Sequence, residues 1–309
     1  MSDTASPQEE KDAPPDGGLT SVIIVAADSG AGLLDCVEHV LASDAAVEVI
    51  VVDNASTDGF VERVAARPQR SGSVRILRNA ANLGFGTACN RGAVIARGNA
   101  YVFLNPDCEI VADTIGRLRA LARDAARGLL GVAVVDADGR VERASRRRDP
   151  TLRRVLMTVT GLARLESRWP CFAGIELPPV AQPAEVERVD AVSGALMYVP
   201  RDVFERVQGF DEGYFLHAED LDLCRRVRDA GFPVGCANSL AVVHRQGGSS
   251  RHRPLFVAWH KHRGMWRWFT KFDPAASNFL LRGSVWAALW AAFGVKAVAI
   301  MIRRAVRAG

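Results

Sequence analysis

The segment Tyr101-Val102-Phe103-Leu104-Asn105-Pro106-Asp107 reads as an apolar strand that ends in a carboxylate. The earlier run from Val49 to Val52 ends in the same way, in Asp53-Asn54-Ala55-Ser56-Thr57-Asp58. Either segment alone is explained by a turn, because Asn, Asp and Pro are common turn residues. Together they indicate a nucleotide site, since ligands of open α/β sheets bind outside the carboxyl ends of the strands. A divalent cation at Asp107 could bridge to a diphosphate, because hard cations prefer oxygen ligands.

Strands and helices alternate around these two segments. We expect strands at residues 22–26, 47–52, 74–77 and 101–104, with helices at 31–42, 60–66 and 87–97 between them. Further along we expect a strand at 189–199, helices at 200–207 and 219–230, and a short strand at 241–243. This alternation predicts an α/β fold with a parallel sheet. Gly194 interrupts the strand at 189–199, which often marks close approach of the backbone to a ligand.

Length and composition predict one catalytic domain with extensions. At 309 residues, 49% of them hydrophobic, the chain can bury a large core, and length alone allows one or two domains. Residues 1–18 lack an apolar run, so we expect a disordered tail without a signal peptide. We assign 19–252 to the catalytic domain, with an insertion or lid at 140–187, and 253–309 to a helical C-terminal extension. The six cysteines form no CxxC pair, which favours reduced thiols and a cytosolic location.

The distribution of charge is more informative than its total. A formal net charge of +4 is too small to indicate a nucleic acid partner. Basic residues gather at 140–154 and 245–267, which suits anionic phosphates or an anionic bilayer surface. A solvated basic face is the alternative for each cluster.

A second group of acids begins the helix expected at 219–230, in the run Phe215-Leu216-His217-Ala218-Glu219-Asp220-Leu221-Asp222. The helix dipole stabilises acids in a first turn, which explains one or two of them more easily than three. A carboxylate that projects from a helix start into a cleft can act as a general base. His244 follows the last expected strand and could complete a cation site with Asp107, although a lone histidine is more often a surface or core residue.

The order and spacing of several motifs resemble those of a known family. The chain resembles family 2 inverting glycosyltransferases, especially the bacterial rhamnosyltransferase-like branch, over about residues 20 to 270. The matching motifs are Val51-Val52-Asp53-Asn54-Ala55-Ser56-Thr57-Asp58, Asn82-Leu83-Gly84-Phe85-Gly86 with Asn90-Arg91-Gly92, Leu104-Asn105-Pro106-Asp107, Ser193-Gly194-Ala195, Gly209-Phe210-Asp211-Glu212 and Glu219-Asp220-Leu221-Asp222-Leu223.

This resemblance implies a GT-A fold with a Rossmann-like, mostly parallel sheet. It also implies inverting transfer of a sugar, rhamnose-like or another hexose, from a dTDP-, UDP- or GDP-linked donor. The acceptor would be a hydroxyl of a glycan or of a polyprenyl-diphosphate-linked molecule, in synthesis of cell-envelope polysaccharide. The reaction would take place in the cytoplasm, at the inner face of the cytoplasmic membrane.

The resemblance also implies roles for single residues. Asp53 would contact the nucleotide base or ribose, and the loop with Asn82 and Gly84 would lie over the nucleotide. Asn105-Pro106-Asp107 occupies the DXD position, with Asn105 in place of the first acid. Asp107 and His244 would then hold Mg²⁺ or Mn²⁺. Asp220 matches the catalytic base, with Glu219 as its neighbour, and Gly194 lies in a donor or acceptor loop.

The C-terminal extension differs in character from the rest of the chain. Residues 254–272 mix tryptophans with lysines and arginines, a pairing suited to a membrane interface. Residues 279–302 are largely apolar but contain Arg282 and Lys296, which favours an interfacial helix over a transmembrane one. The alternatives are a helix packed on the catalytic core or against a second copy in a homodimer.

Two other function classes fit parts of the sequence. A non-catalytic nucleotide-sugar-binding regulatory protein of the same fold would keep Asp53 and Asp107 but could dispense with Asp220. A Rossmann oxidoreductase would need a third glycine after the first strand, where Asp35 stands.

Overall fold

The computed structural model describes residues 18–67, 74–124, 127–178, 184–245 and 253–308. Apart from Gly18, the expected disordered tail lies outside the described residues. Residue 252, at the expected boundary of the catalytic domain, also lies outside them.

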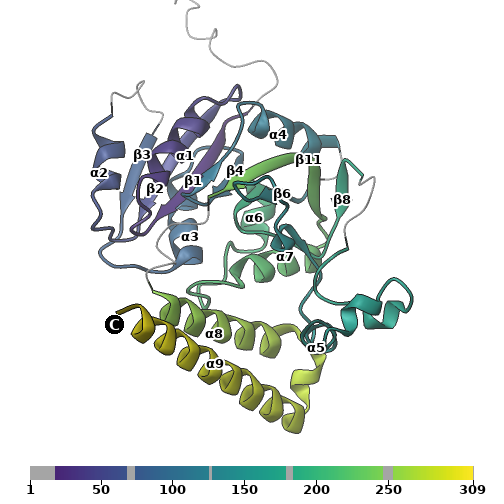
Figure 1. Ribbon diagram of the computed structural model, residues 1–309. Helices are drawn as coiled ribbons and strands as arrows, with labels where there is room; N and C mark the ends of the chain where they lie inside the picture. The colour runs from purple at the N-terminus through teal and green to yellow at the C-terminus, as the bar shows by residue number, and fades with distance from the viewer. Residues whose placement is uncertain (1–17, 68–73, 125–126, 179–183, 246–252, 309) are drawn as a thin grey trace, which may run out of the picture.

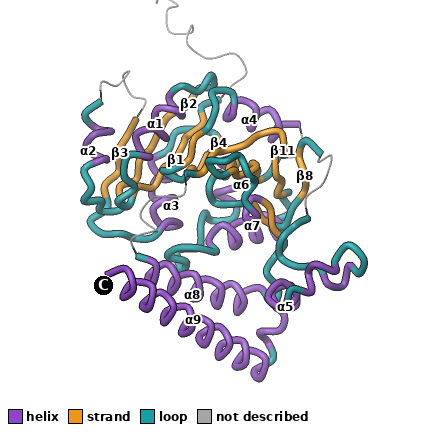
Figure 2. Tube along the Cα trace, viewed as in Figure 1, coloured by secondary structure: helices purple, strands orange, loops and turns teal. Residues whose placement is uncertain are grey.

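A twisted sheet forms the centre of the molecule (Figures 1 and 2). Its strands run in the order β3 (Val74–Arg78), β2 (Val47–Asp53), β1 (Thr20–Ala26), β4 (Ala100–Leu104), β10 (Leu196–Pro200), β6 (Leu129–Val135), β11 (Val234–His244) and β5 (Cys108–Glu109), with β8 (Val186–Arg188) also on β11. The pairs β3–β2, β2–β1, β1–β4 and β6–β11 are parallel, whereas β10 is antiparallel to both of its neighbours. The expectation of a mostly parallel sheet is therefore confirmed.

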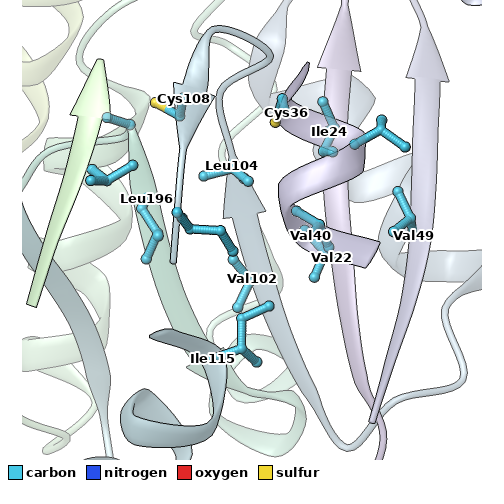
Figure 3. Packing of buried hydrophobic residues seen from close by; sticks show 14 of the residues in the cluster. Val22, Ile24, Cys36, Val40, Val49, Val102, Leu104, Cys108, Ile115 and Leu196 are labelled. Carbon is cyan, nitrogen blue, oxygen red and sulfur yellow. The ribbon is translucent and has the colours of Figure 1, made fainter. Parts of the chain in front are cut away.

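Helices cover both faces of the sheet. They are α1 (Gly32–Leu41), α2 (Phe60–Ala65), α3 (Phe85–Ile95), α4 (Thr114–Asp124), α6 (Arg201–Arg206) and α7 (Glu219–Asp229). Successive residues of a strand point to opposite faces, so Val22 and Ile24 of β1 pack with α1 and α4, and Ile23 packs with α3. Figure 3 shows part of the hydrophobic core on the α1 and α4 side of the sheet, where β1, β4 and α1 meet.

Three parts of the chain differ from the sequence-based expectation. The strand expected at 189–199 is two strands, since β9 (Ala191–Val192) pairs with β7 (Arg146–Arg147) in a separate small sheet and only β10 joins the main one. Strand β11 begins seven residues before the expected Ala241, and a bulge between Ala237 and Ala241 carries it to His244. Helix α4 and strand β6 were not assigned from the sequence.

The expected insertion at 140–187 is partly helical. Its elements are the short 3₁₀ turns η1 (Arg143–Ser145), η2 (Leu162–Leu165) and η3 (Pro170–Phe172), and helix α5 (Leu152–Thr160). Thr151 caps α5 by accepting a hydrogen bond from the Arg154 amide, and Gly161 ends the helix in a left-handed conformation. The amide of Leu152 donates to Asp273 at 2.6 Å, so the insertion contacts the C-terminal extension.

The C-terminal extension has two parts with different surroundings. Helix α8 (Pro254–Phe272) joins the core, because Trp268 is fully buried and Lys271 binds the buried carboxylate of Asp222 at 2.5 Å. After η5 (Pro274–Ser277), helix α9 (Phe279–Ala308) runs back along α8 (Figure 1). The stretch Phe279–Arg303 of α9 is long and apolar enough to cross a membrane, and none of it is buried within the protein.

Candidate active site

The ends of β1 and β2 form one side of the candidate site. Asp53 is the last residue of β2 and is buried, with one oxygen accepting from the Ser56 amide at 2.8 Å and the other from the Arg78 guanidinium at 3.0 Å. Asp28, in the loop after β1, accepts from the Thr57 amide at 2.7 Å. These hydrogen bonds hold the two strand-end loops together, as expected for residues at the carboxyl edge of a parallel sheet.

The glycine-bearing loop connects this edge to the start of α7. The side-chain oxygen of Asn82 accepts from the Gly84 amide at 3.0 Å and from Asn54 at 3.3 Å. Gly84 has a φ of +86°, and a Cβ at this position would lie 2.5 Å from the carbonyl oxygen of Phe215. No other residue type fits there without a shift, because the conformation and the close contact both require glycine.

The candidate metal site lies at the ends of β4 and β11. His244 Nε2 lies 3.2 Å from Asp107 Oδ1, and His244 Nδ1 lies 3.2 Å from Glu142 Oε1. The hydrogen bond to Asp107 raises the pKa of His244. A carboxylate and an imidazole are suitable ligands for Mg²⁺ or Mn²⁺, and Glu142 would orient the histidine as an outer-shell partner.

Cys108 lies beside these ligands, and its Sγ lies within 4.8 Å of the ligand atoms of Asp107 and His244. The cysteine is fully buried, and burial raises the pKa of its thiol well above the ordinary value. A protonated thiol is a poor ligand for a hard cation, so Asp107 and His244 are the two side chains that fit the metal.

The candidate base stands at the start of α7. Asp220 Oδ2 accepts from the Arg147 guanidinium at 2.5 Å and from the Gly194 amide at 3.2 Å. A Cβ on Gly194 would lie 3.4 Å from Asp220 Cβ, so the loop and the acid are in direct contact. His217 and Ala218 both have positive φ, at 67° and 72°, and this sharp turn presents the first residues of α7.

Glu219 has a different environment from Asp220. It is buried, and desolvation, followed by the charge of Asp220, raises its pKa to about 8. Glu219 is therefore protonated at neutral pH and cannot serve there as an ionised base. Asp220, which pairs with Arg147, is the better candidate for that role.

A short segment joins the metal site to the base. The Asn105 amide donates to the carbonyl of Ala195 at 2.9 Å, and the neighbouring Gly194 amide donates to Asp220. The backbone of 194–195 thus lies between the turn after β4, which leads to Asp107, and the helix that carries Asp220.

Arg147 and Glu142 were missed as functional residues, although both lie in the expected insertion. The basic cluster at 140–154 was expected to suit phosphates, but its arginines mostly bind acids of the same chain. Beyond the contact of Arg147, the pairs are Arg140–Asp138, Arg143–Glu176, Arg146–Glu187, Arg148–Glu166 and Arg154–Asp190. Only the position of Arg147 next to Asp220 gives it a place in the site.

A comparison with protein families decides the class of enzyme. The model of the family described as glycosyl transferase family 2 matches residues 21–176. The chain belongs to glycosyltransferase family 2. It is 32% identical over 271 residues to the N-acetylglucosaminyl-diphospho-decaprenol L-rhamnosyltransferase of Mycobacterium tuberculosis, an alignment that covers 79% of this chain and 83% of that protein.

Solved structures support the GT-A fold. The chain superposes with a TM-score of 0.58 on a mannosyltransferase from Pyrobaculum calidifontis in complex with GDP-Man and Mn²⁺, at 17% identity over 96% of this chain and 83% of that one. The TM-score is 0.54 for TarS of S. aureus with UDP-GlcNAc, at 14% identity over 89% of this chain and 80% of that one. For GalNAc-T7 with UDP, GalNAc and Mn²⁺ the TM-score is 0.55 at 18% identity, over 76% of this chain and 45% of that longer one.

The family resemblance and the GT-A fold are thus confirmed, and glycosyl transfer is the activity of this chain. This finding disfavours the non-catalytic regulatory protein. The roles of the single residues at the site stay predictions.

Proposed function

We propose that this glycosyltransferase is inverting and metal-dependent, and that it transfers a rhamnose-like sugar or another hexose from a nucleotide diphosphate to a lipid-linked acceptor. The observation that carries the proposal is the arrangement around Gly194 and Ala195, with Asp220 on one side and the turn of Asn105 and Asp107 on the other. Inversion requires a single in-line displacement, for which a base and a charged leaving group must lie on opposite sides of the anomeric carbon.

Asp107 and His244 hold the cation in this proposal. They supply two ligands, and the remaining positions suit donor phosphate oxygens and water. When bound, Mg²⁺ or Mn²⁺ neutralises charge on the departing diphosphate. Solved neighbours that contain Mn²⁺ support a metal of this kind. Asn105 leaves the protein with one carboxylate at this position, so metal and donor are expected to bind together.

Asp220 removes the proton of the acceptor hydroxyl. Its carboxylate is held by Arg147 and by the Gly194 amide, which fixes the direction of its oxygens. Protonated Glu219 lies behind it without adding a second negative charge. The proton passes from the hydroxyl to Asp220 while the new glycosidic bond forms and the bond to the diphosphate breaks.

The donor nucleotide lies at the ends of β1 and β2, with Asp53 at the base or ribose and the loop of Asn82 and Gly84 over it. The contacts of Asp53 with Arg78 and of Asn82 with Gly84 hold this edge in shape. The candidate donors are dTDP-, UDP- and GDP-linked sugars, and the solved neighbours named above include UDP and GDP complexes.

The acceptor is a polyprenyl-diphosphate-linked saccharide at the inner face of the cytoplasmic membrane. The Mycobacterium relative is named for such an acceptor. Helix α9 presents an apolar surface, with Phe279, Leu280, Val295 and Ile302 each more than half exposed. A membrane interface would remove these apolar side chains from water, which is favourable.

The orientation of α9 favours an interfacial position over a span. Trp266 of α8 and Trp286 of α9 line one pocket, and the rings of Trp259 and Phe293 pack edge to face further along, with centroids 5.5 Å apart, so the two helices stay in contact over several turns. If α9 crossed the bilayer, the charged residues of α8 would enter the hydrocarbon with it, at several kcal/mol each. If α9 instead lies parallel to the membrane surface, it buries its apolar face in the lipid while α8 stays packed on the catalytic domain.

A screen of nucleotide sugars for protection against thermal unfolding, with and without Mn²⁺, identifies the donor. With that donor and a prenyl-diphospho-saccharide, Asp220→Asn should abolish transfer and leave the donor Kd nearly unchanged, because the substitution removes the base and keeps the shape. Asp229→Asn, at the exposed end of the same helix, is the matched control. Equal turnover by Asp220→Asn and the parent would exclude Asp220 as the base.

A further inference from the structure

Two lysines lie beside the turn that precedes Asp220. Helix α8 packs directly on this turn, because a Cβ on Gly264 would lie 2.5 Å from the carbonyl oxygen of His217. Lys261 is one helical turn before Gly264 and therefore shares its side of α8. On α9, Phe293 contacts His262 of α8 with ring centroids 5.5 Å apart, and Lys296 follows Phe293 by one turn.

These lysines have no acidic partner among the described residues. Both are exposed, and none of the ion pairs found in the described parts of the chain includes either of them. The acids that α8 does contact are Asp211 and Asp222, and they form ion pairs with Arg267 and Lys271 further along the helix.

The cations around the turn before Asp220 shift the pKa values of their neighbours. Although Lys261 reaches solvent, desolvation lowers the pKa of its ammonium, and the charges of Lys296 and Arg147 lower it further. Burial lowers the pKa of His217 to about 4, and the charges of Lys261, Arg147 and Lys296 lower it further, whereas the charge of Asp220 raises it. The Nε2 atom of His217 is buried without a hydrogen-bond partner in the described structure. Arg147 is already paired with Asp220, so Lys261 and Lys296 are the two cations beside this neutral imidazole that favour an anion.

We propose that Lys261 and Lys296 bind the diphosphate of the lipid-linked acceptor, with Arg147 on the side of the base. This proposal rests on the proposed function, which supplies the acceptor class. Ammonium groups are common phosphate ligands, and two of them match the charge of a diphosphate diester. The acceptor sugar would extend from the lysines toward Asp220, and the prenyl chain would leave along the exposed apolar face of α9.

The location separates this site from the donor site. Donor phosphates are assigned to Asp107 and His244, beyond the backbone of 194–195, whereas the lysines lie on the α7 side of it. Lys296 also belongs to the helix whose apolar face would meet the membrane. A lipid-linked acceptor needs its diphosphate to lie between the membrane-facing helix and the catalytic base. The two lysines lie at that position.

Steady-state kinetics of the full-length protein test the site. Lys261→Gln and Lys296→Gln should each raise the KM for a prenyl-diphospho-saccharide in detergent by about tenfold, the effect of losing one charged hydrogen bond. The kcat and the donor Kd should change little. Lys296→Arg should keep the parent KM, and Arg282→Gln, an exposed cation near the other end of α9, is the matched control.

Two further measurements separate the outcomes. Binding of farnesyl diphosphate, measured by calorimetry without any donor, should weaken in the Lys261→Gln/Lys296→Gln double variant even if no transfer activity is found, so this result does not depend on the proposed function. Binding to vesicles with anionic headgroups should change less than the acceptor KM. If the acceptor KM and the farnesyl diphosphate affinity are unchanged while vesicle binding falls, the lysines bind headgroups and the proposal is wrong.

Discussion

The protonated state of Glu219 makes a quantitative prediction about stability. An ordinary glutamate has a pKa of 4.5, whereas burial and the charge of Asp220 raise that of Glu219 to about 8 in the folded protein. Below pH 4.5 the residue is protonated in both the folded and the unfolded chain, and folding is not affected. Between these values the unfolded chain releases a proton that the folded chain retains. The free energy of unfolding therefore falls as the pH rises from 4.5 toward 8.

The size of this effect follows from the two pKa values. The value pH 7 lies about 2.5 units above the ordinary pKa of glutamate, and each unit corresponds to about 1.4 kcal/mol of unfolding free energy. Glu219→Gln is neutral at every pH and avoids this loss. It should raise the free energy of unfolding at pH 7 by about 3 kcal/mol, or the melting temperature by about 5 °C for a chain of this length. At pH 5 the gain should be below about 1 kcal/mol.

Urea unfolding at pH 5, 6, 7 and 8 measures the difference between the parent and Glu219→Gln. Glu205→Gln, on the exposed surface of α6, is the control and should give the same difference from the parent at every pH. Parallel curves for Glu219→Gln and the parent from pH 5 to pH 8 would refute the reasoning. They would mean that Glu219 is ionised in the folded protein, and that it competes with Asp220 for the role of the base.

Three further predictions concern the metal, the core and the membrane. Asp107→Ala should weaken nucleotide-diphosphate binding by about tenfold or more with Mn²⁺ present and little with chelator, as measured by calorimetry; a loss independent of metal would assign Asp107 to the fold. Asp222→Asn should lower the free energy of unfolding by about 3 kcal/mol or more, because it removes the buried negative charge that pairs with both Arg226 and Lys271; an unchanged urea midpoint would contradict this. A chain that ends after Phe272 should stay folded and bind nucleotide, but bind anionic liposomes more weakly, and salt should reduce the preference of the full-length chain for anionic over neutral vesicles; unfolding of the truncated chain would assign α9 to the core or to a homodimer interface.

The sequence predicted the parts of the fold that are set by local pattern. Continuous apolar runs such as 49–52 and 101–104 can only be buried strands at this length, and the acids that follow them must lie at the edge of the sheet. The same reasoning was insufficient for β10 and β11. Strand β10 lies antiparallel between β4 and β6, both of which come much earlier in the chain. The small residues at 234–237 form a strand by pairing with β6 on one side and β8 on the other.

The sequence indicated the acids of the candidate site, together with His244 and Gly194, but it did not indicate Arg147, which pairs with Asp220. Asp107 and Asp220 stand in recognisable positions, after a strand and at a helix start. Arg147 is one of many arginines between 140 and 154, and nothing in the local sequence distinguishes it from Arg146 or Arg148. Its partner is 73 residues away, and only the pairing of β7 with β9 brings the two together.

Helix α8 connects the candidate active site to α9 through packed side chains. Trp268 fixes α8 in the core, Gly264 lets it contact the turn before Asp220, and Trp259 holds α9 on its outer side. A membrane that covers α9 would therefore set the distance from the lipid surface to the base through packed side chains. A lipid-linked acceptor needs such a fixed distance, because its diphosphate stays at the headgroup level while its sugar must reach Asp220. This geometry explains why α8, although it follows the catalytic motifs in the sequence, carries buried core residues and not only surface charges.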